Sequence, residues 1–223
     1  MEHKRLTLFA GHYGSGKTNI AVNYAIRLSR EGKKVCIADL DIVNPYFRTA
    51  DSVRELTDAG VTLITPQFAN SNVDLPALPA EAYRLVQDKS IYGVMDIGGD
   101  DRGAYALGRY VPFIKEEGNY RMIFVANCCR PLTTPPEDAL EVMREIETAC
   151  GLQFTDIVNN SNLGPETTAE TVTDSLAYIE KLSALSGLPI FAHTAEAEVA
   201  KQLDLPDVFP LQLQEKYFAL PSI

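Results

Sequence analysis

The feature that most constrains the fold is a glycine-rich run at residues 11–18, GHYGSGKT, which fits the pattern G-x-x-x-x-G-K-[ST]. An apolar segment at residues 6–10 precedes this run, and an amphipathic segment at residues 17–30 follows it. Glycines at these spacings allow the backbone to curl so that successive N–H groups point inward at the start of a helix. The sequence therefore predicts a strand, a phosphate-binding loop and a helix, in that order.

The same pattern assigns individual residues to a nucleotide and to Mg²⁺. We expect Lys17 to place its ammonium group on the β and γ phosphates, and we expect Thr18 to bind Mg²⁺ through its hydroxyl. Asn19, one step into the helix, is expected near the α-phosphate. The residues of this segment expected to bind the nucleotide are Gly11, Gly14, Ser15, Gly16, Lys17, Thr18 and Asn19.

Short apolar runs alternate with helical patterns along the rest of the chain. Strands are expected at residues 6–10, 34–38, 61–65, 91–96, 120–126, 154–158 and 188–192, and long helices at 17–30, 135–150 and 166–186. This alternation predicts a three-layer α/β/α fold with a mostly parallel twisted sheet, in one nucleotide-binding domain spanning residues 1–223. Ligands of such sheets bind beyond the carboxyl ends of the strands.

Aspartates follow or end two of the expected strands, at the edge where the phosphate-binding loop lies. Asp39 and Asp96 are predicted to hold Mg²⁺ together with Thr18, because Mg²⁺ prefers oxygen ligands. Asp41 is predicted to be catalytic by positioning the attacking water, alongside Lys17. After Asp96, the pair Gly98-Gly99 would let the next loop approach the γ-phosphate and respond to it.

Charge and cysteine content narrow the classes of partner. The formal net charge is −10 and the pI about 4.8, which disfavours binding to nucleic acid or to anionic membranes. No apolar segment approaches the length of a membrane span, and none of the four cysteines forms a C-x-x-C pair. We therefore expect a reduced, cytoplasmic location.

Three segments together, Gly11–Thr18, Ala38–Asp41 and Met95–Gly99, resemble the MinD/ParA branch of P-loop ATPases, also called the CobQ/CobB/MinD/ParA nucleotide-binding domain. The resemblance implies a slowly hydrolysing ATPase that binds ATP or ADP with Mg²⁺. It also implies a switch, in which Mg-ATP orders the loops after Asp39 and Asp96 and docks a client protein.

Two family features are missing from this sequence. His12 occupies the place of a signature lysine that reaches across a dimer in this branch, and His12 is not a permanent cation. A homodimer is therefore left open. The segment at residues 218–223 lacks the basic stripe of the membrane helix that ends MinD-type proteins.

The segment Asn159–Asn162, NNSN, stands where GTPases carry N-K-x-D. The fourth residue is an amide, and an amide cannot accept both N–H donors of guanine as a carboxylate does. ATP is therefore predicted over GTP. By the family resemblance, Asn159 contacts adenine, with Asn160 as the alternative contact; a turn-forming asparagine is the competing interpretation.

Two other functions compete with the switch ATPase. One is a small-molecule kinase or ATP-dependent ligase, similar to dethiobiotin synthetase, with an acceptor site in residues 66–79. The polar residues of that segment are Gln67, Asn70, Asn72 and Asp74. The other is a nucleotide sensor without catalysis, against which the strand-end aspartates argue.

A few polar residues near the expected site have no assigned role. Cys128-Cys129 could serve metal or redox chemistry, although cysteine more often packs as a small apolar residue. Arg102 and Arg130 could contact phosphate or a partner, or be solvated.

Overall fold

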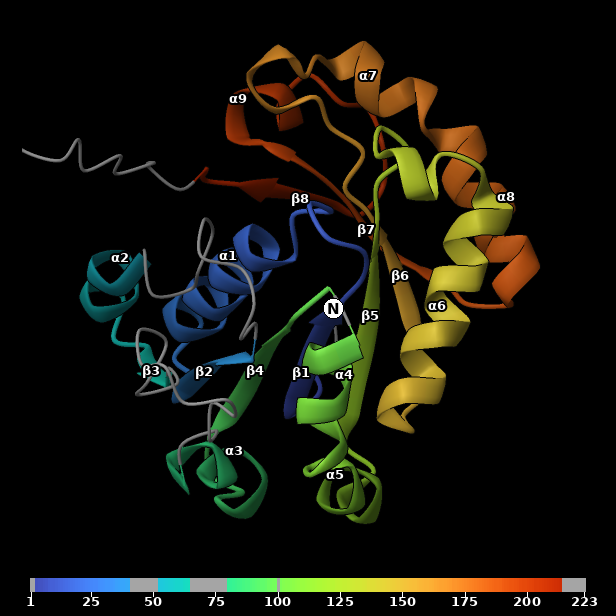
Figure 1. The fold of residues 1–223 in the computed structure, drawn as a ribbon. Coiled ribbons are helices and arrows are strands. Elements are labelled where there is room, and N and C mark those ends of the chain that lie inside the picture. Colours follow the sequence, from blue (N-terminus) through green and yellow to red (C-terminus); the bar gives the residue numbers. More distant parts are fainter. Residues whose placement is uncertain (1–2, 41–51, 65–79, 100, 214–223) are drawn as a thin grey trace, which may run out of the picture.

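A computed structural model of the chain describes residues 3–40, 52–64, 80–99 and 101–213, without the side chains of residues 80, 101 and 102. Its middle layer is an eight-stranded sheet with the order β3-β2-β4-β1-β5-β6-β7-β8 (Figure 1). Each neighbouring pair of strands is parallel. The strands are β1 (Leu6–Ala10), β2 (Val35–Leu40), β3 (Thr62–Ile64), β4 (Tyr92–Ile97), β5 (Tyr120–Ala126), β6 (Asp156–Asn159), β7 (Ile190–Glu196) and β8 (Val208–Leu211).

Helices cover both faces of this sheet, which confirms the predicted three-layer α/β/α fold (Figure 1). One face carries α1 (Lys17–Arg30) and α2 (Val53–Asp58). The opposite face carries α3 (Arg84–Gln87), α4 (Asp101–Gly108), α5 (Val111–Glu117), α6 (Pro136–Cys150) and α8 (Leu176–Ser186). The short helices α7 (Ala169–Asp174) and α9 (Ala197–Ala200) lie toward β7 and β8.

The core is divided between the two faces by the alternation of side chains along each strand. In β1, Leu6 and Leu8 join the apolar cluster under α4 and α6, while Phe9 joins the cluster under α1. All three side chains are fully buried. Burial on both faces explains why the central strands read as continuous apolar runs rather than as alternating ones.

The prediction of one continuous helix over residues 166–186 is wrong, because the structure has two helices that meet at Ser175. The first begins after Thr168, whose side chain forms a capping box with Thr171. At the junction, the Ser175 hydroxyl donates to the carbonyl oxygen of Val172 at 2.6 Å and accepts from Asn159 Nδ2 at 2.8 Å. A polar contact with β6 therefore fixes the break.

The prediction that the last strand lies at residues 188–192 is also wrong, since β7 continues to Glu196 and β8 follows it. β8 has four residues and pairs with β7 alone, so it is an edge strand in the part of the chain that the structure describes. Its exposed Pro210 has no N–H to donate, and proline is tolerated at such an edge.

A buried cation ties the amino end of β1 to its surroundings. Arg5 is 6% exposed, and its Nη1 donates to the carbonyl oxygens of Leu85 at 2.8 Å and Ile91 at 3.1 Å. Its guanidinium also forms a two-pronged ion pair with Glu117, which accepts from Lys89 Nζ at 2.6 Å. Burial raises the pKa of the Glu117 carboxyl, but the hydrogen bonds from Arg5 and Lys89 outweigh it, so the net pKa is lowered.

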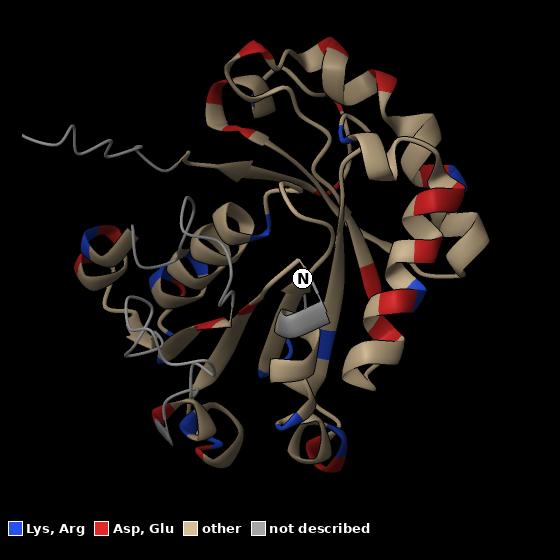
Figure 2. Cartoon of the chain, in the orientation of Figure 1, with Lys and Arg blue, Asp and Glu red and all other residues tan. Residues whose placement is uncertain are grey.

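The outer surface carries much of the negative charge. Acidic residues are spread along α6 and α7 (Figure 2). Among the described residues, no helix is long and apolar enough to cross a membrane.

Candidate functional site

The glycine-rich run forms a tight loop between β1 and α1, which we call the phosphate loop (residues 11–18). Gly14 and Gly16 have φ values of 74° and 93°, in the left-handed region that favours glycine. A Cβ atom on Gly11 would lie 2.7 Å from the carbonyl oxygen of Val125, so only glycine fits against β5. The amide of Ser15 donates to the carbonyl oxygen of His12 at 3.1 Å and closes the turn. A tight glycine turn that leads into a helix is an arrangement in which backbone N–H groups can bind an anion.

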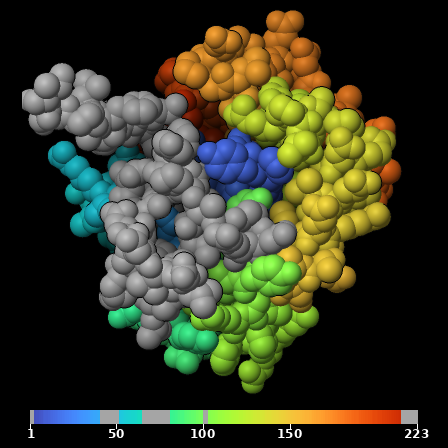
Figure 3. Space-filling model, viewed as in Figure 1, coloured from blue at the N-terminus to red at the C-terminus, as the bar shows by residue number. Residues whose placement is uncertain are grey.

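The expected phosphate-binding side chains lie at this loop. Lys17 is 5% exposed, and its Nζ donates to the carbonyl oxygen of His12 at 3.2 Å, which curls the side chain back over the loop. Thr18 and Asn19 are half-buried in the first turn of α1. The tip of the loop, by contrast, is open, since Tyr13 is 54% exposed. In the space-filling view this N-terminal segment (blue) reaches the surface (Figure 3).

Two aspartates lie side by side at the carboxyl ends of neighbouring strands. Asp39 of β2 and Asp96 of β4 are register partners, and they are 2% and 1% exposed. β4 also pairs with β1, which leads into the phosphate loop. Among the described residues, no group of three or more His, Cys, Asp or Glu side chains is placed so that it could hold a metal ion. A pair of carboxylates suits Mg²⁺, which prefers oxygen ligands and keeps several of its waters, and the Thr18 hydroxyl as a further ligand stays a prediction.

The loop after β4 packs directly on the phosphate loop. A Cβ atom on Gly99 would lie 2.7 Å from the backbone nitrogen of Tyr13 and 3.0 Å from Lys17 Nζ. A Cβ on Gly103, in the first turn of α4, would lie 2.6 Å from the Cα of Gly98. Glycine is therefore required at both positions for this close approach.

Asn160 was expected only as an alternative contact for the base, and the structure gives it a different role, as a support of the phosphate loop from the turn after β6. Asn160 Nδ2 donates to the carbonyl oxygen of Ser15 at 2.6 Å, and its Oδ1 accepts from the Thr194 hydroxyl at 2.6 Å. A Cβ on Gly16 would lie 2.2 Å from the same amide nitrogen. The contact joins residues 145 positions apart, so no local sequence pattern indicated it.

Asn159, the residue expected to contact the base, lies next to this support with its side chain fully buried. Its Nδ2 donates to the Ser175 hydroxyl at 2.8 Å and lies 3.4 Å from His193 Nδ1. Its Oδ1 accepts from the amide of Ser161 at 3.1 Å. These bonds direct the amide into the protein, and a contact with the base stays a prediction. Burial lowers the pKa of His193, although Asp207 and Glu180 oppose the shift.

The structure describes three further residues that the sequence singled out, Cys128, Cys129 and His12. Cys128 and Cys129 are half-buried with sulfur atoms 4.0 Å apart, and burial together with the Cys128 thiol raises the pKa of Cys129. His12 Nδ1 lies 2.9 Å from the carbonyl oxygen of Tyr13. Asp41, the segment 66–79 and the side chain of Arg102 lie outside the described residues.

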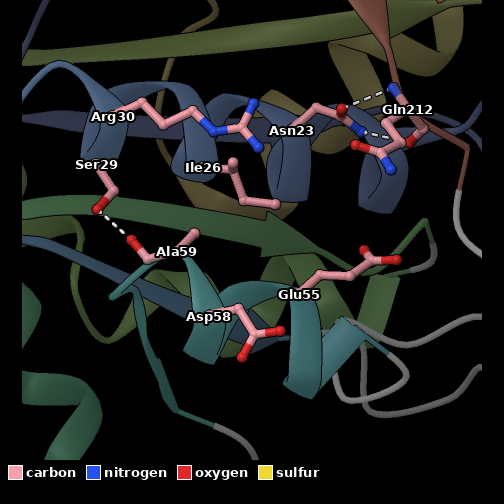
Figure 4. A pocket seen from close by; sticks show the side chains of 8 residues that line it. All are labelled: Asn23, Ile26, Ser29, Arg30, Glu55, Asp58, Ala59 and Gln212. Atoms are coloured by element: carbon pink, nitrogen blue, oxygen red, sulfur yellow. Dashed lines mark hydrogen bonds between the residues drawn. The ribbon is translucent and has the colours of Figure 1, made fainter.

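A cavity of about 400 Å³ lies elsewhere, between the second half of α1, α2 and the end of β8 (Figure 4). Asn23 forms two bonds across it with the backbone of Gln212, at 2.9 and 2.8 Å. Both basic and acidic side chains line this cavity, namely Arg30, Glu55 and Asp58, and no residue of the phosphate loop lines it. The cavity is therefore separate from the candidate site.

No protein-family model matches the chain, and no curated protein matches it in sequence. Solved structures do match. Cell division protein FtsY from Thermotoga maritima is 18% identical, with a TM-score of 0.60, over 85% of this chain and 61% of that one. The signal recognition particle receptor FtsY from Elizabethkingia anophelis is 18% identical, with a TM-score of 0.55, over 86% of this chain and 59% of that one.

A third match, the signal recognition particle 54 kDa protein from Aeropyrum pernix in complex with GDP, is 17% identical with a TM-score of 0.54, over 86% of this chain and 41% of that one. The chain thus spans about three fifths of the length of the FtsY chains it matches. At these identities the likeness concerns the fold alone. The chain shares the three-layer α/β fold of these proteins.

Proposed function

We propose that the protein binds a nucleoside triphosphate with Mg²⁺ in the phosphate loop, hydrolyses it slowly, and acts as a switch. The observation that carries this proposal is the contact of Gly99 with Tyr13 and Lys17. A γ-phosphate held by the loop would lie beside the backbone of the segment that leads into α4. Such contacts are the means by which nucleotide switches sense the terminal phosphate.

We assign phosphate binding, Mg²⁺ binding and positioning of the attacking water to residues at the same edge of the sheet. Lys17 would neutralise charge on the phosphates, and Asp39 and Asp96 would hold Mg²⁺ together with Thr18. When bound, Mg²⁺ supplies charge neutralisation at the phosphate oxygens. Asp41 is proposed to position the attacking water. Slow intrinsic turnover is expected, because hydrolysis in such proteins depends on a fully assembled site.

ATP is the proposed nucleotide, and GTP is its competitor. The structural neighbour from Aeropyrum pernix is in complex with GDP, so ATP has to be compared with GTP as the ligand. In this chain Asn162 stands where a guanine-binding aspartate would be. Its side chain bonds within its own turn, donating to the carbonyl oxygen of Asn160 at 2.7 Å and accepting from the amide of Gly164 at 3.1 Å. An amide at this position cannot accept both N–H donors of guanine as a carboxylate would.

The switch output is proposed to be the docking of a client protein, as the resemblance to the MinD/ParA branch implies. The acidic outer helices favour a protein client over nucleic acid or an anionic membrane (Figure 2). A homodimer is compatible with the exposed Tyr13 at the loop tip, but His12 lacks the permanent charge of the family's lysine.

The test is a titration of the purified protein with ATP, ADP and GTP, with and without Mg²⁺, followed by measurement of phosphate release. Lys17→Ala is the control. We expect Mg²⁺-dependent binding that favours ATP, with slow release, and loss of both in Lys17→Ala. Failure of the wild-type protein to bind any nucleotide would overturn the proposal, while a preference for GTP would overturn only the choice of base.

A further inference from the structure

The loop between β5 and α6 brings an arginine onto the phosphate loop. Arg130 Nε donates to the carbonyl oxygen of Gly14 at 2.8 Å, across 116 residues of sequence. β5 pairs with β1, so the end of β5 lies beside the start of the phosphate loop. In the space-filling view, the surface from this part of the chain (yellow-green) borders the blue N-terminal segment (Figure 3).

The backbone of Arg130 is held on both sides by a compact turn. Its amide donates to the carbonyl oxygen of Asn127 at 3.3 Å, and the Thr133 hydroxyl donates to the same oxygen at 2.8 Å. The carbonyl oxygen of Arg130 accepts from the Thr133 amide at 3.0 Å and from the Thr134 hydroxyl at 2.9 Å. Asn127, at the base of the turn, is fully buried. The side chain therefore starts from a fixed position, which reduces the entropy lost when it binds a ligand.

Most of the guanidinium of Arg130 remains available for a ligand. Within the described part of the chain it forms no ion pair, and its two terminal nitrogens, Nη1 and Nη2, have no hydrogen-bond partner. By comparison, the guanidinium of Arg5 is saturated by Glu117 and by backbone carbonyl oxygens. A donor of any charge could bond to the Gly14 carbonyl, so this bond alone does not require an arginine.

Arg130 is a planar cation with two terminal nitrogens available, and it lies at the rim of the phosphate loop. These features suit a phosphate ligand. Guanidinium groups bind phosphate oxygens in a two-pronged manner. We propose that Arg130 binds the polyphosphate group of the nucleotide, as a second cation beside Lys17. This inference rests on the proposed function, since it concerns the same nucleotide. It adds a contact that the glycine-rich motif does not contain.

The experiment compares wild-type protein with Arg130→Ala, Arg130→Gln and Arg130→Lys in titrations with ATP, ADP and inorganic triphosphate at low and high salt. The glutamine variant retains a neutral donor for the Gly14 carbonyl oxygen. The lysine variant retains the charge without the planar fork. Arg144→Ala, which removes an exposed arginine of α6, is the matched control for net charge. Circular dichroism and melting temperature establish that each variant is folded.

We expect Arg130→Ala and Arg130→Gln to weaken the binding of all three ligands about tenfold, corresponding to the loss of about 1.4 kcal/mol. Arg130→Lys should recover part of the loss, and Arg144→Ala should bind as wild type. The difference between wild type and Arg130→Gln should shrink at high salt, because a charge interaction is screened. A purely structural clamp would show no such salt dependence.

Wild-type affinity in the folded Arg130→Gln variant would overturn the inference, because the bond to Gly14 would then be the whole role of the side chain. That result would leave the proposed function standing. Absence of nucleotide binding by the wild type would overturn both. If the alanine and glutamine variants do not fold, the test rests on Arg130→Lys: a partial loss of affinity would support the inference, and wild-type affinity would overturn it.

Discussion

Asn160 and Ser15 are joined by a 2.6 Å hydrogen bond from the side-chain amide of one to the backbone carbonyl oxygen of the other. Both residues are buried. Through this bond the turn after β6 supports the phosphate loop, and the Thr194 hydroxyl orients the same amide at 2.6 Å. The loop that would hold the phosphates is therefore fixed by an element distant from it in sequence.

Removal of this support should affect stability and binding together. Asn160→Ala leaves the buried carbonyl oxygen of Ser15 without its donor, which costs about 1–3 kcal/mol of unfolding free energy. We expect nucleotide affinity to fall at the same time, because the loop loses its fixed geometry. Urea unfolding and ATP titration measure the two effects. Asn162→Ala in the same turn, which does not bond to the loop, should have the smaller effect on affinity.

The loop after β4 should tolerate no side chain at Gly99. Gly99→Ala introduces a Cβ atom 2.7 Å from the backbone nitrogen of Tyr13, so one of the two loops must move. We expect phosphate release to fall roughly 10- to 100-fold, as small misplacements near a reacting group do. Gly108→Ala, in the same connection, is the control: its Cβ would lie 3.8 Å from its nearest neighbour. That variant should keep activity and gain up to about 1 kcal/mol of stability. Full activity in Gly99→Ala would refute the role given to this contact.

The ion pair between Glu117 and Arg5 should make stability depend on acidic pH. The pKa of Glu117 is lowered from its ordinary value of 4.5, so the unfolded chain takes up this proton at higher pH than the folded protein does. The contribution is complete above about pH 5 and is lost as the pH falls through the folded-state pKa. Glu117→Gln should cost roughly 3 kcal/mol at neutral pH and remove that part of the pH dependence. Urea unfolding between pH 3 and pH 7 checks both, and an unchanged acid limb would contradict the assignment.

His193 should act in a different pH window. Burial lowers its pKa from 6.5, so the unfolded chain binds this proton first as the pH falls. Stability should decrease below about pH 6.5, down to the folded-state pKa, by at most about 1.4 kcal/mol per pH unit. His193→Gln should flatten this slope. Protonation at Nδ1 would also place a donor against Asn159 Nδ2, 3.4 Å away. Thermal melts of both proteins from pH 5 to pH 8 provide the measurement; equal slopes would contradict the prediction.

The sequence alone predicted the elements that are strongly patterned over short distances. Residues 6–10, 17–30 and 120–126 were predicted with the bounds that the structure shows. The strand-end aspartates Asp39 and Asp96 were predicted at one edge of the sheet, and they are register partners there. In each case the information is local, as an apolar run, a helical period or a motif of fixed spacing.

Features that depend on distant contacts were not predicted. The break at Ser175 is set by a bond from Asn159, and the neighbouring sequence is helical on both sides. β8 is short and contains Pro210, which counts against a strand in any local pattern. The bond from Asn160 to the phosphate loop was not predicted, and Arg130 was predicted only as a possible phosphate contact; both reach the loop through the adjacency of β1, β5 and β6. Sheet order, which a single sequence does not specify, determines these contacts.

The packing of Gly103 on Gly98 has a mechanical consequence. With no room for a Cβ between them, the first turn of α4 packs directly on the backbone of Gly98. Gly99, next to Gly98, packs on the phosphate loop, and Tyr105 of α4 is 65% exposed. Because Gly98 packs on Gly103 and Gly99 packs on the phosphate loop, we expect a substitution at any of these glycines to disturb both the loop and the first turn of α4.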